Sequence, residues 1–309
     1  MTKPNTSLVP KWMGVLGEWQ NKNGVLQFLG KGLPATAGQQ PLVIGVAASS
    51  VTRFTEGKVV ATVRFSDTAK PGGHTAGIVL GFKSLSEPFY YTEFGDTCGF
   101  SISTYVPGLF RPLVRHQSSR LSANTDYVIE AYLRGRFVGL HVDGVKVAEA
   151  TLPDQPPGHQ VALIASGITP VRFSKTSVTI ERPRAFIATQ FTEPFDRIWD
   201  TVIRKATEDE EFNPIRIDEV AGPNPILADI KRHVSEAAVV IAEITPLNAN
   251  VFYEVGYADA LKKPLILLAQ KGTKLPFDVQ GYRTIFYEDV IGGEAKLSKD
   301  LRKQLKVIL

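Results

Sequence analysis

Two nearly continuous apolar runs, separated by a stretch of helix length, constrain the fold of this chain more than any other feature. The runs are residues 238–244 and 264–269, and residues 250–261 between them are long enough for a helix. A strand buried on both faces is apolar throughout, and parallel strands are joined by a crossover that is usually helical. The pattern therefore predicts strands in the middle of a parallel sheet.

Neighbouring segments extend this pattern to five strands. The other predicted strands are residues 185–189, 214–217 and 284–287. The first predicted helix begins near Thr192 and Pro194. The second has Asn224 as its cap and Pro225 as its first helical residue, and ends near Glu236. The other two run from about Asn250 to Leu261 and from Lys296 to Ile308. We expect a three-layer, doubly wound α/β fold, in which ligands bind beyond the carboxyl ends of the strands.

Residues before 181 have a different texture, rich in Gly, Ser, Thr and aromatic residues, with almost no helical periodicity. Residues 58–65 alternate, with Val59, Ala61, Val63 and Phe65 on one face. Asp143-Gly144 joins residues 137–142 to 145–148 and is a strong hairpin signal. Further predicted strands are residues 75–82, 99–105, 127–133, 161–165 and 171–180. Many short strands with turns between them predict an antiparallel β-sandwich.

The two textures meet at Glu181-Arg182-Pro183, which we take as a domain boundary. The prediction is a sandwich domain over residues 1–181 and an α/β domain over residues 184–309. A chain of 309 residues has room for two such domains, each with its own core.

Composition narrows the function classes. The single cysteine, Cys98, excludes an internal disulfide and a multi-cysteine metal site, and the five histidines, His74, His116 and His233 among them, show no metal-ligand spacing. We therefore expect no metal and no cofactor. The net charge of +4 is modest and does not favour nucleic acid as a partner. No leader-like start and no run long enough to span a membrane are present, so we expect a cytoplasmic protein.

The densest candidate for chemistry is ITPLNANVFYEVGYA, residues 244–258, which leaves the carboxyl end of a central strand. With Asn250 as N-cap, Glu254 falls near the first turn of the helix, where the helix dipole favours an ionised carboxylate. Such a carboxylate suits attack on an electron-poor sugar carbon. Tyr253 and Tyr257, one turn apart, could stack on a base. The alternative is that Glu254 only complements the dipole on a solvated face.

Other candidates lie at the same predicted edge. The loop of Thr189, Gln190 and Phe191 could hold an anion or a ribose through its backbone N–H groups, or be an ordinary connection. Glu243 interrupts an apolar strand, and a carboxylate there needs a partner or a task. Three further residues, Asn248, Asn250 and Asp278, also follow strand ends. No glycine-rich dinucleotide fingerprint or phosphate-binding loop is present.

Several segments share their pattern with a known superfamily. They are AFIATQF with FDRIWDTVI, then AAVVIAEITPLNANVFYEVGYADALKKPLILLAQ, and LPFDVQGYRTIFY. Through these motifs, and above all the N-x-N-V-F-Y-E-x-G-Y-A core beside K-P-x-I-L, residues 184–287 resemble the nucleoside 2-deoxyribosyltransferase-like superfamily, which is close in fold to TIR domains. The resemblance implies a flavodoxin-like sheet and cleavage of an N-glycosidic bond, with Glu254 matching the catalytic glutamate.

Two positions depart from that pattern. Many relatives have Asp where Glu243 stands, and a Met-Pro-Phe loop where Thr189, Gln190 and Phe191 stand. These positions touch sugar or phosphate in relatives, so the departures bear on the choice of substrate.

The first domain resembles the concanavalin A-like jelly-roll sandwiches through GEWQNKNGVLQF, TAGIVLGF, YVIEAYLRGRFVGLHVDGVKV and VRFSKTSVTI. Sandwich hydrolases of that group carry acids at alternate positions of one strand. Here Glu93 and Asp96 are three apart and on opposite faces of an extended segment, which disfavours a glycoside hydrolase. Aromatic residues could form a sugar-stacking platform, or belong to the core: Trp12, Trp19, Tyr90, Tyr91 and Tyr105.

The sequence and these resemblances together predict cleavage or transfer at the N-glycosidic bond of a nucleoside, a nucleotide or NAD, with catalytic Glu254 and Glu243. The TIR likeness adds NAD hydrolysis in bacterial defence, and a homo-oligomer. The rival expectations are a non-catalytic nucleotide sensor, whose sandwich binds a glycan or a protein, and a pure assembly module.

Overall fold

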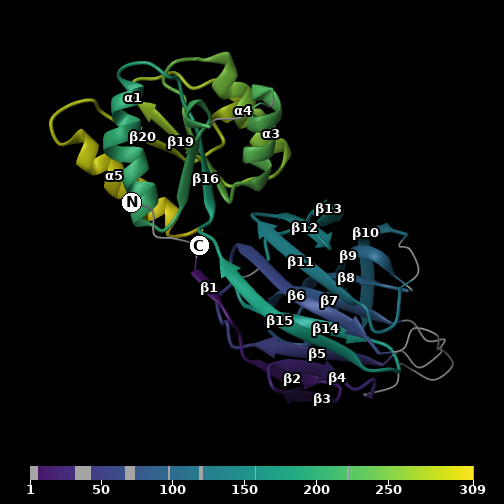
Figure 1. Cartoon of the computed structure of the whole chain (residues 1–309). Coiled ribbons are helices and arrows are strands. Elements are labelled where there is room, and N and C mark those ends of the chain that lie inside the picture. Colours follow the sequence, from purple (N-terminus) through teal and green to yellow (C-terminus); the bar gives the residue numbers. More distant parts are fainter. Residues whose placement is uncertain are drawn as a thin grey trace. The chain divides into compact units, whose positions relative to one another are not determined.

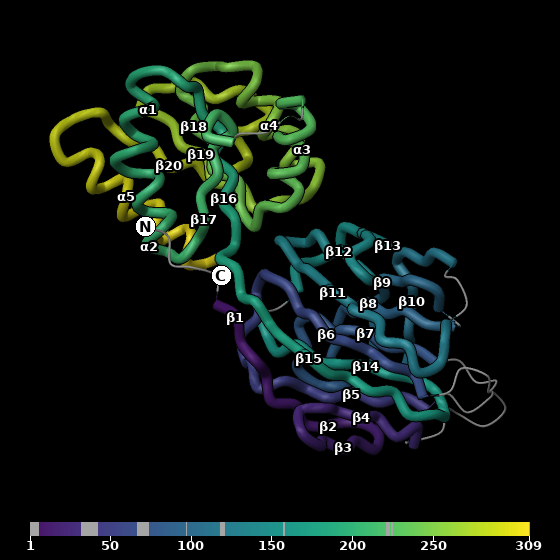
Figure 2. The backbone as a smooth tube through the Cα atoms, in the orientation of Figure 1, coloured from purple at the N-terminus to yellow at the C-terminus, as the bar shows by residue number. Residues whose placement is uncertain are grey.

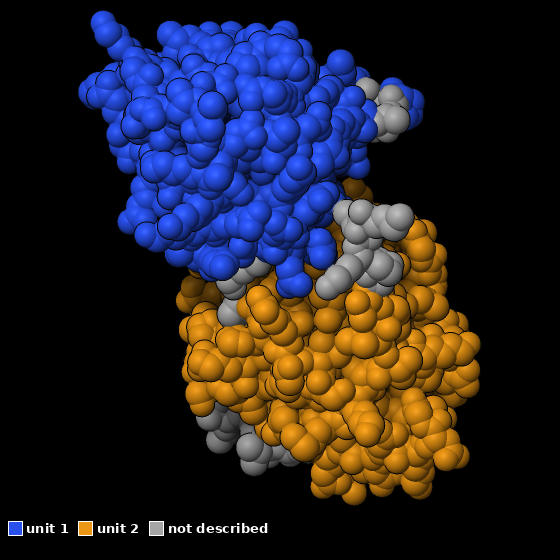
Figure 3. All heavy atoms as spheres, turned by 90° about the vertical axis from the view of Figure 1, so that its left-hand side faces the viewer, with its two compact units in different colours: residues 1–4, 182–309 blue, residues 5–181 orange. Residues whose placement is uncertain are grey.

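A computed structural model describes residues 6–31, 43–66, 74–96, 98–117, 121–156, 158–220, 223 and 225–308. The chain divides into two units, one formed by Asn5–Glu181 and one that contains Arg182–Leu309 (Figure 3). Each unit is described by itself below.

The first unit is a sandwich of two antiparallel sheets (Figure 1). One sheet, in the order β13-β12-β11-β6-β15-β4-β3 with β1 also on β15, contains β1 (Thr6–Leu8), β3 (Trp19–Lys22), β4 (Val25–Phe28), β6 (Gly57–Phe65), β11 (Asp126–Arg134), β12 (Phe137–Val142), β13 (Val145–Thr151) and β15 (Val171–Ile180). The other, in the order β10-β9-β8-β7-β14-β5-β2, contains β2 (Trp12–Leu16), β5 (Ile44–Ser49), β7 (Thr75–Phe82), β8 (Phe89–Gly95), β9 (Gly99–Val106), β10 (Leu109–His116) and β14 (Gln160–Ser166).

Alternation along the strands builds the core between the two sheets. In β6 the side chains of Val59, Ala61, Val63 and Phe65 are all fully buried, which confirms the predicted face. The hairpin between β12 and β13 is confirmed as well. Its two turn residues have positive φ, 49° at Asp143 and 79° at Gly144, as the twist of a two-residue hairpin requires.

The last two strands of the sandwich lie inside the sheets and not at their edges. β15 pairs with β6 along one side, and its other side is shared by β1, against residues 178–180, and β4, against residues 171–173. β14 lies between β7 and β5 in the second sheet. Each sheet is therefore completed in its middle by a late segment of the chain.

The second unit is a five-stranded sheet, wholly parallel, in the order β17-β16-β18-β19-β20. Figure 2 shows the path of the backbone through this unit. Its strands are β16 (Arg184–Ala188), β17 (Asn213–Arg216), β18 (Val239–Glu243), β19 (Leu265–Gln270) and β20 (Thr284–Tyr287). Its helices are α1 (Phe195–Ile198), the π-helix η1 (Trp199–Ile203), α2 (Arg204–Asp209), the 3₁₀ turn η2 (Ile217–Glu219), α3 (Ile226–Glu236), α4 (Ala249–Ala260), the 3₁₀ turn η3 (Phe277–Val279) and α5 (Gly293–Leu305).

Helices cover both faces of this sheet, which gives the three predicted layers (Figure 1). Alternate residues of β18 point into two separate cores. Val239 and Ile241 pack with α1, η1, α2 and α5, whereas Val240 and Ala242 pack with α3 and α4. Continuous burial on both faces is the physical reason why this strand is an unbroken apolar run.

Helix starts differ from the prediction in three places. Pro225 takes the N-cap position of α3 and not the first helical position, and the predicted cap at Asn224 lies outside the described residues. Asn248, and not Asn250, is the N-cap of α4. α5 begins at Gly293, before the predicted Lys296.

A fragment of residues 182–309 is expected to fold by itself, because the second unit holds two apolar cores of its own, one on each face of its sheet. Circular dichroism should show mixed helix and strand with a cooperative thermal transition, and amide NMR signals should be dispersed. A fragment with collapsed amide dispersion would show that the sandwich supplies part of its core.

Candidate functional site

The sheet order brings two strand ends together where the chain reverses its direction of winding. β16 and β18 are neighbours, and β17 and β19 lie outside them on either side. In open α/β sheets, ligands bind at such a switch point, beyond the carboxyl ends of the strands. Here the loop of Thr189, Gln190 and Phe191 leaves β16, and the segment that reaches Asn248 leaves β18.

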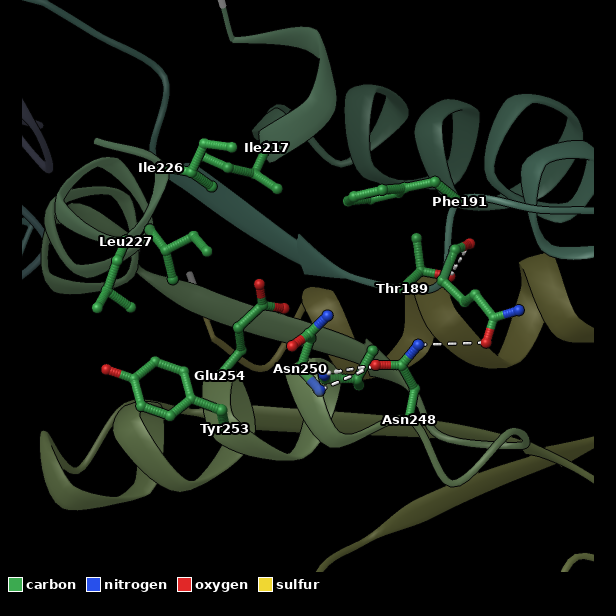
Figure 4. A pocket seen from close by; sticks show the side chains of 12 residues that line it. Thr189, Phe191, Ile217, Ile226, Leu227, Asn248, Asn250, Tyr253 and Glu254 are labelled. Atoms are coloured by element: carbon green, nitrogen blue, oxygen red, sulfur yellow. Dashed lines mark hydrogen bonds between the residues drawn. The ribbon is translucent and has the colours of Figure 1, made fainter. Parts of the chain in front are cut away.

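A pocket of about 760 Å³ lies at this point (Figure 4). It is lined by residues from both loops, from α3 and α4, and from the turn after β17: Thr189, Gln190, Phe191, Ile217, Ile226, Leu227, Ile230, Asn248, Asn250, Val251, Tyr253 and Glu254. Its volume is typical of a small-molecule site. The structure thus brings together seven of the residues that the sequence singled out: Thr189, Gln190, Phe191, Asn248, Asn250, Tyr253 and Glu254.

One wall of the pocket is polar and is tied together across the two loops. The Asn248 side-chain amide donates to the Gln190 side-chain carbonyl at 3.2 Å. The Asn248 side-chain Oδ1 accepts from the backbone N–H of Asn250 at 2.9 Å and thereby caps α4. Gln190 in turn donates to the Thr192 hydroxyl at 2.7 Å. This chain of hydrogen bonds fixes the loop after β16 against the start of α4.

The position of the cap changes the surroundings of Glu254. With Asn248 as N-cap, Glu254 is in the second turn of α4, beyond the reach of the N-terminal dipole. The expected stabilisation of an ionised carboxylate by the helix start is therefore wrong. Its physical reason is the register: Asn248 and Asn250 are both good caps, and here the Asn248 side chain accepts from the backbone N–H groups of Asn250 and Val251 while Gln190 holds its amide.

Glu254 is a buried carboxylate that points into the pocket (Figure 4). Glu254 is 6% exposed. Within the part of the chain that the structure describes, no hydrogen bond or ion pair reaches its carboxylate. Burial alone raises the pKa of Glu254 to about 7. A carboxylate that is desolvated without a partner is costly to keep, and such groups gather at functional sites.

Burial of Glu254 predicts a dependence of stability on pH. Because the folded state raises this pKa from 4.5 to about 7, the native protein holds the proton more tightly than the unfolded chain. The stabilisation is complete below pH 4.5 and is lost as pH rises through 7. Glu254→Gln, which is neutral at every pH, should match the wild type near pH 4.5 and be more stable at pH 8, by up to about 3 kcal/mol. Urea titrations at both pH values measure this, and equal differences at both would contradict it.

The opposite wall of the pocket is apolar, and the sequence singled out only Phe191 among its residues. This wall is made of Phe191, Ile217 and three residues of α3: Ile226, Leu227 and Ile230. Ile226 is 71% exposed at the first turn of α3. Local sequence does not mark Ile226 and Leu227 as pocket residues, because it is the fold that places them there.

Charge on the pocket lining comes from Glu254 alone, since no Lys, Arg or His is among the lining residues. Arg216 directly precedes the lining residue Ile217 in the sequence, and no other arginine is adjacent in sequence to a lining residue. The Arg216 guanidinium is occupied by two carboxylates: Asp218 accepts from its Nε and Nη2 at 2.7 and 2.6 Å, and Asp196 accepts from Nη1 at 2.8 Å. The described site therefore offers no cation to a phosphate group.

Glu243 does not join the pocket. Side chains alternate along β18, and Glu243 shares the face of Val239 and Ile241, opposite to the face that α4 covers. It is 1% exposed and accepts a hydrogen bond from the Tyr287 hydroxyl at 3.0 Å. The sequence placed Glu243 and Glu254 in one site. They are separated because alternate side chains of β18 point to opposite faces of the sheet, and Glu243 points to the face away from α4.

The Glu243 carboxylate is also bonded to the segment that follows β18. The Thr245 hydroxyl donates to it and accepts from the backbone N–H of Gln270 at 2.8 Å. Burial raises the pKa of Glu243 to about 7, although the bonds from Thr245 and Tyr287 oppose this rise. The partner that a carboxylate in an apolar strand requires is therefore this hydroxyl network.

Two further predicted residues lie outside the pocket lining. Tyr257 is on the same helix as Tyr253, and their rings are parallel with centroids 6.5 Å apart, but only Tyr253 reaches the pocket. Asp278 is exposed on η3. Neither Tyr257 nor Asp278 is among the residues that line the pocket at the switch point between β16 and β18.

Asn248→Ala is expected to destabilise the second unit by about 1 kcal/mol, because it removes the cap of α4 and the bond to Gln190. Asn250→Ala is the matched control: its exposed side chain caps nothing, and alanine is the better helix former. Chemical denaturation of both variants measures the difference. Equal losses of stability would contradict the assignment of Asn248 as the cap.

In the sandwich, the candidate aromatic residues do not form one platform. Trp12, Trp19 and Tyr90 pack against the core between the sheets, whereas Tyr91 and Tyr105 belong to a second apolar cluster. The alternative of a structural role, which the sequence left open, describes their positions. The five side chains are therefore divided between two apolar clusters.

The remaining polar candidates have no catalytic surroundings. Cys98 is buried, and burial raises the pKa of its thiol, which disfavours the reactive thiolate. Glu93 accepts from the Ser101 hydroxyl at 3.2 Å. Across the residues described, no group of three or more His, Cys, Asp or Glu side chains could hold a metal ion. Within the same residues, no helix combines the length and the apolar character needed to cross a membrane.

Comparison with known proteins finds no matching family model and no matching curated protein. Solved structures similar to this chain include the carbohydrate-binding module CBM66 of Bacillus subtilis, with 13% identity and a TM-score of 0.42 over 54% of this chain and 94% of that one. The galectin LEC-6 of Caenorhabditis elegans has 14% identity and a TM-score of 0.32 over 50% and 94%. A prokaryotic β-1,3-1,4-glucanase from a mouse hindgut metagenome has 12% identity and a TM-score of 0.39 over 55% and 92%.

Proposed function

We propose that the second unit cleaves or transfers at the N-glycosidic bond of a nucleoside, with Glu254 as the reacting carboxylate. The single observation that carries this proposal is the Glu254 side chain: buried, without a described partner, and directed into the pocket at the switch point of the sheet. The motif resemblance of residues 184–287 to the nucleoside 2-deoxyribosyltransferase-like superfamily supports the same residue and the same reaction.

The two walls of the pocket suit the two halves of a nucleoside. The apolar wall, with Phe191, Ile226 and Leu227, offers contact to a flat, weakly hydrated base. The polar wall, with Asn248, Asn250 and Glu254, offers amide and carboxylate groups to a sugar. Since both walls meet across one cavity, a ligand that fills it spans the bond between base and sugar.

The reaction that fits is a substitution at the anomeric carbon. A carboxylate oxygen of Glu254 bonds to this carbon while the C–N bond breaks, and the electron pair leaves with the base, which takes a proton from solvent. Water or an N–H nitrogen of a second base then attacks the same carbon and loses its proton to solvent, while the bond to Glu254 breaks and its electron pair returns to the carboxylate. The first choice is hydrolysis and the second is transfer. The first step needs Glu254 in its ionised form, and the second step releases it in that form.

The absence of cations from the lining favours nucleosides over the other predicted substrates. A nucleotide or NAD carries phosphate, which proteins hold with Arg, Lys or the N–H groups of a helix start. The described lining has no Arg or Lys, the cap of α4 is filled by Asn248, and Glu254 would repel a phosphate. We therefore place nucleosides first and treat nucleotides and NAD as the comparison substrates.

Glu243 has a supporting role in this proposal. Through Thr245 it fixes the segment between β18 and α4, which carries Asn248 into the pocket wall. It acts on the substrate only through that segment, so we assign it to positioning and not to the bond-breaking step.

Chromatography of the full chain after incubation with nucleosides, nucleoside monophosphates and NAD tests the proposal. Free base from nucleosides, in excess over that from the phosphorylated compounds, is the expected result. Binding of nucleosides without release of base would replace catalysis by the sensor role. If no compound binds, the catalytic role and the sensor role both fail. An assembly role then remains to be tested. It includes the expected homo-oligomer and the glycan or protein partner expected for the sandwich.

A further inference from the structure

We propose that Arg216, which lies outside the pocket lining, is a positioning residue that holds the ring of Phe191 as a flat platform for a planar aromatic group of the ligand. This inference rests on the proposed function for the location of the ligand, and it adds which residue receives the base and what keeps that residue in place.

Arg216 is fixed from several sides. Asp218 takes two of its N–H groups and Asp196 a third, at distances between 2.6 and 2.8 Å. The guanidinium carbon lies 5.5 Å from the centroid of the buried Trp199 ring. A planar guanidinium bonded in this two-pronged way has little freedom to rotate. Its orientation is therefore set by the second unit before any ligand arrives.

Phe191 is the exposed end of this arrangement. The guanidinium carbon of Arg216 lies 5.3 Å from its ring centroid, within the range of a cation–π contact. Phe191 is 45% exposed and lies in the loop after β16, outside any helix or strand. Arg216 makes the cation–π contact described for this ring, and this contact can set the angle of the ring.

The geometry leaves a surface of the ring for the ligand. Arg216 covers one face of Phe191 and is not itself among the pocket-lining residues, whereas Phe191 is. Figure 4 shows the ring nearly edge-on, across the pocket from Asn250 and Glu254. A base that stacks there would turn its sugar toward the polar wall. Stacking accepts any base, because every base has a flat π face.

Equilibrium dialysis of the full chain with adenine, uracil and D-ribose tests the inference, since none of these probes can be cleaved. Phe191→Leu should lower the affinity for both bases by roughly tenfold, the size expected for the loss of one stacking contact. Arg216→Gln should lower it to a similar extent, and the double variant should be no weaker than Phe191→Leu alone, because both changes remove one contact. The affinity for ribose should stay the same throughout.

Arg204→Gln is the matched control. Arg204 stacks on Trp199 at 4.5 Å and pairs with Glu219, but no described contact joins it to Phe191. It should leave base affinity unchanged. If Arg216→Gln does not fold, Arg216→Lys keeps the charge without the two-pronged bond and should still lower base affinity.

Four results would overturn the inference: additive losses in the double variant, equal losses for ribose and bases, wild-type affinity in Phe191→Leu or in both Arg216 variants, or a wild type that binds neither base. These results are separate from the fate of the proposed function. A wild type that binds bases but releases none from nucleosides overturns catalysis alone. Base release with full affinity in Phe191→Leu overturns the platform alone.

Discussion

Glu254→Gln is expected to lower the rate of base release by at least about 100-fold while the protein stays folded. Gln keeps the volume and an acceptor oxygen of the side chain, but it cannot form the bond to the anomeric carbon or balance the positive charge that grows there. Loss of one preorganised electrostatic group costs on the order of 10²- to 10³-fold in turnover. Because no described residue shares the charge of Glu254, no neighbour can replace it.

The measurement is the rate of base release from nucleosides by chromatography, with the fold checked by thermal melting. Asp259→Asn is the control: it removes a carboxylate charge from the same helix, and its acceptor oxygen can still bind the Tyr282 hydroxyl. This control should keep wild-type turnover. A Glu254→Gln protein with turnover within a few-fold of wild type would remove Glu254 from the mechanism.

The pH dependence of kcat/KM should have an acidic limb with its midpoint near 7. Burial raises the pKa of Glu254 to about 7, and the reaction needs the ionised form. Below the midpoint the ionised fraction falls tenfold per pH unit, so the rate should drop by about 100-fold from its plateau to pH 5. An exposed glutamate would place the limb near its ordinary pKa and leave the rate at pH 5 almost unchanged.

Initial rates between pH 5 and 9, at substrate concentrations below KM, measure this limb. The direction of the change separates two roles of the same carboxyl group. A rate that falls as pH drops identifies the carboxylate as the active form. A rate that rises toward low pH would show that Glu254 acts as a proton donor to the leaving base, and the covalent step proposed above would be wrong.

Long apolar runs made the second unit predictable from the sequence, because only buried parallel strands combine such runs with helix-length spacers. Single residues were harder. Asn248 and Asn250 are equally good caps by residue type, and the Asn248 side chain that caps α4 is also bonded to Gln190, 58 residues earlier in the chain. The role of Glu243 depends on its parity along β18, which one register step would reverse.

Exposed apolar residues and irregular strands escaped prediction for a related reason. Ile226 and Leu227 fit no buried stripe, and only the fold shows that they line a pocket. In the sandwich, β10 contains Pro112 next to a register shift, at an edge where a missing N–H is tolerated. Whether such a segment forms a strand, or lines a pocket, depends on residues that are distant in the sequence. The local sequence pattern holds no information about those residues.

The central positions of β14 and β15 have a consequence for synthesis of the chain. Translation runs from the N-terminus, so every other strand of the sandwich leaves the ribosome before the two that complete the sheets. Until residue 180 emerges, β6 and β4 in one sheet, and β7 and β5 in the other, present unpaired edges to other nascent chains. Both sheets of the sandwich can therefore be completed only after β14 and β15 have left the ribosome. The α/β unit begins to emerge directly after these two strands.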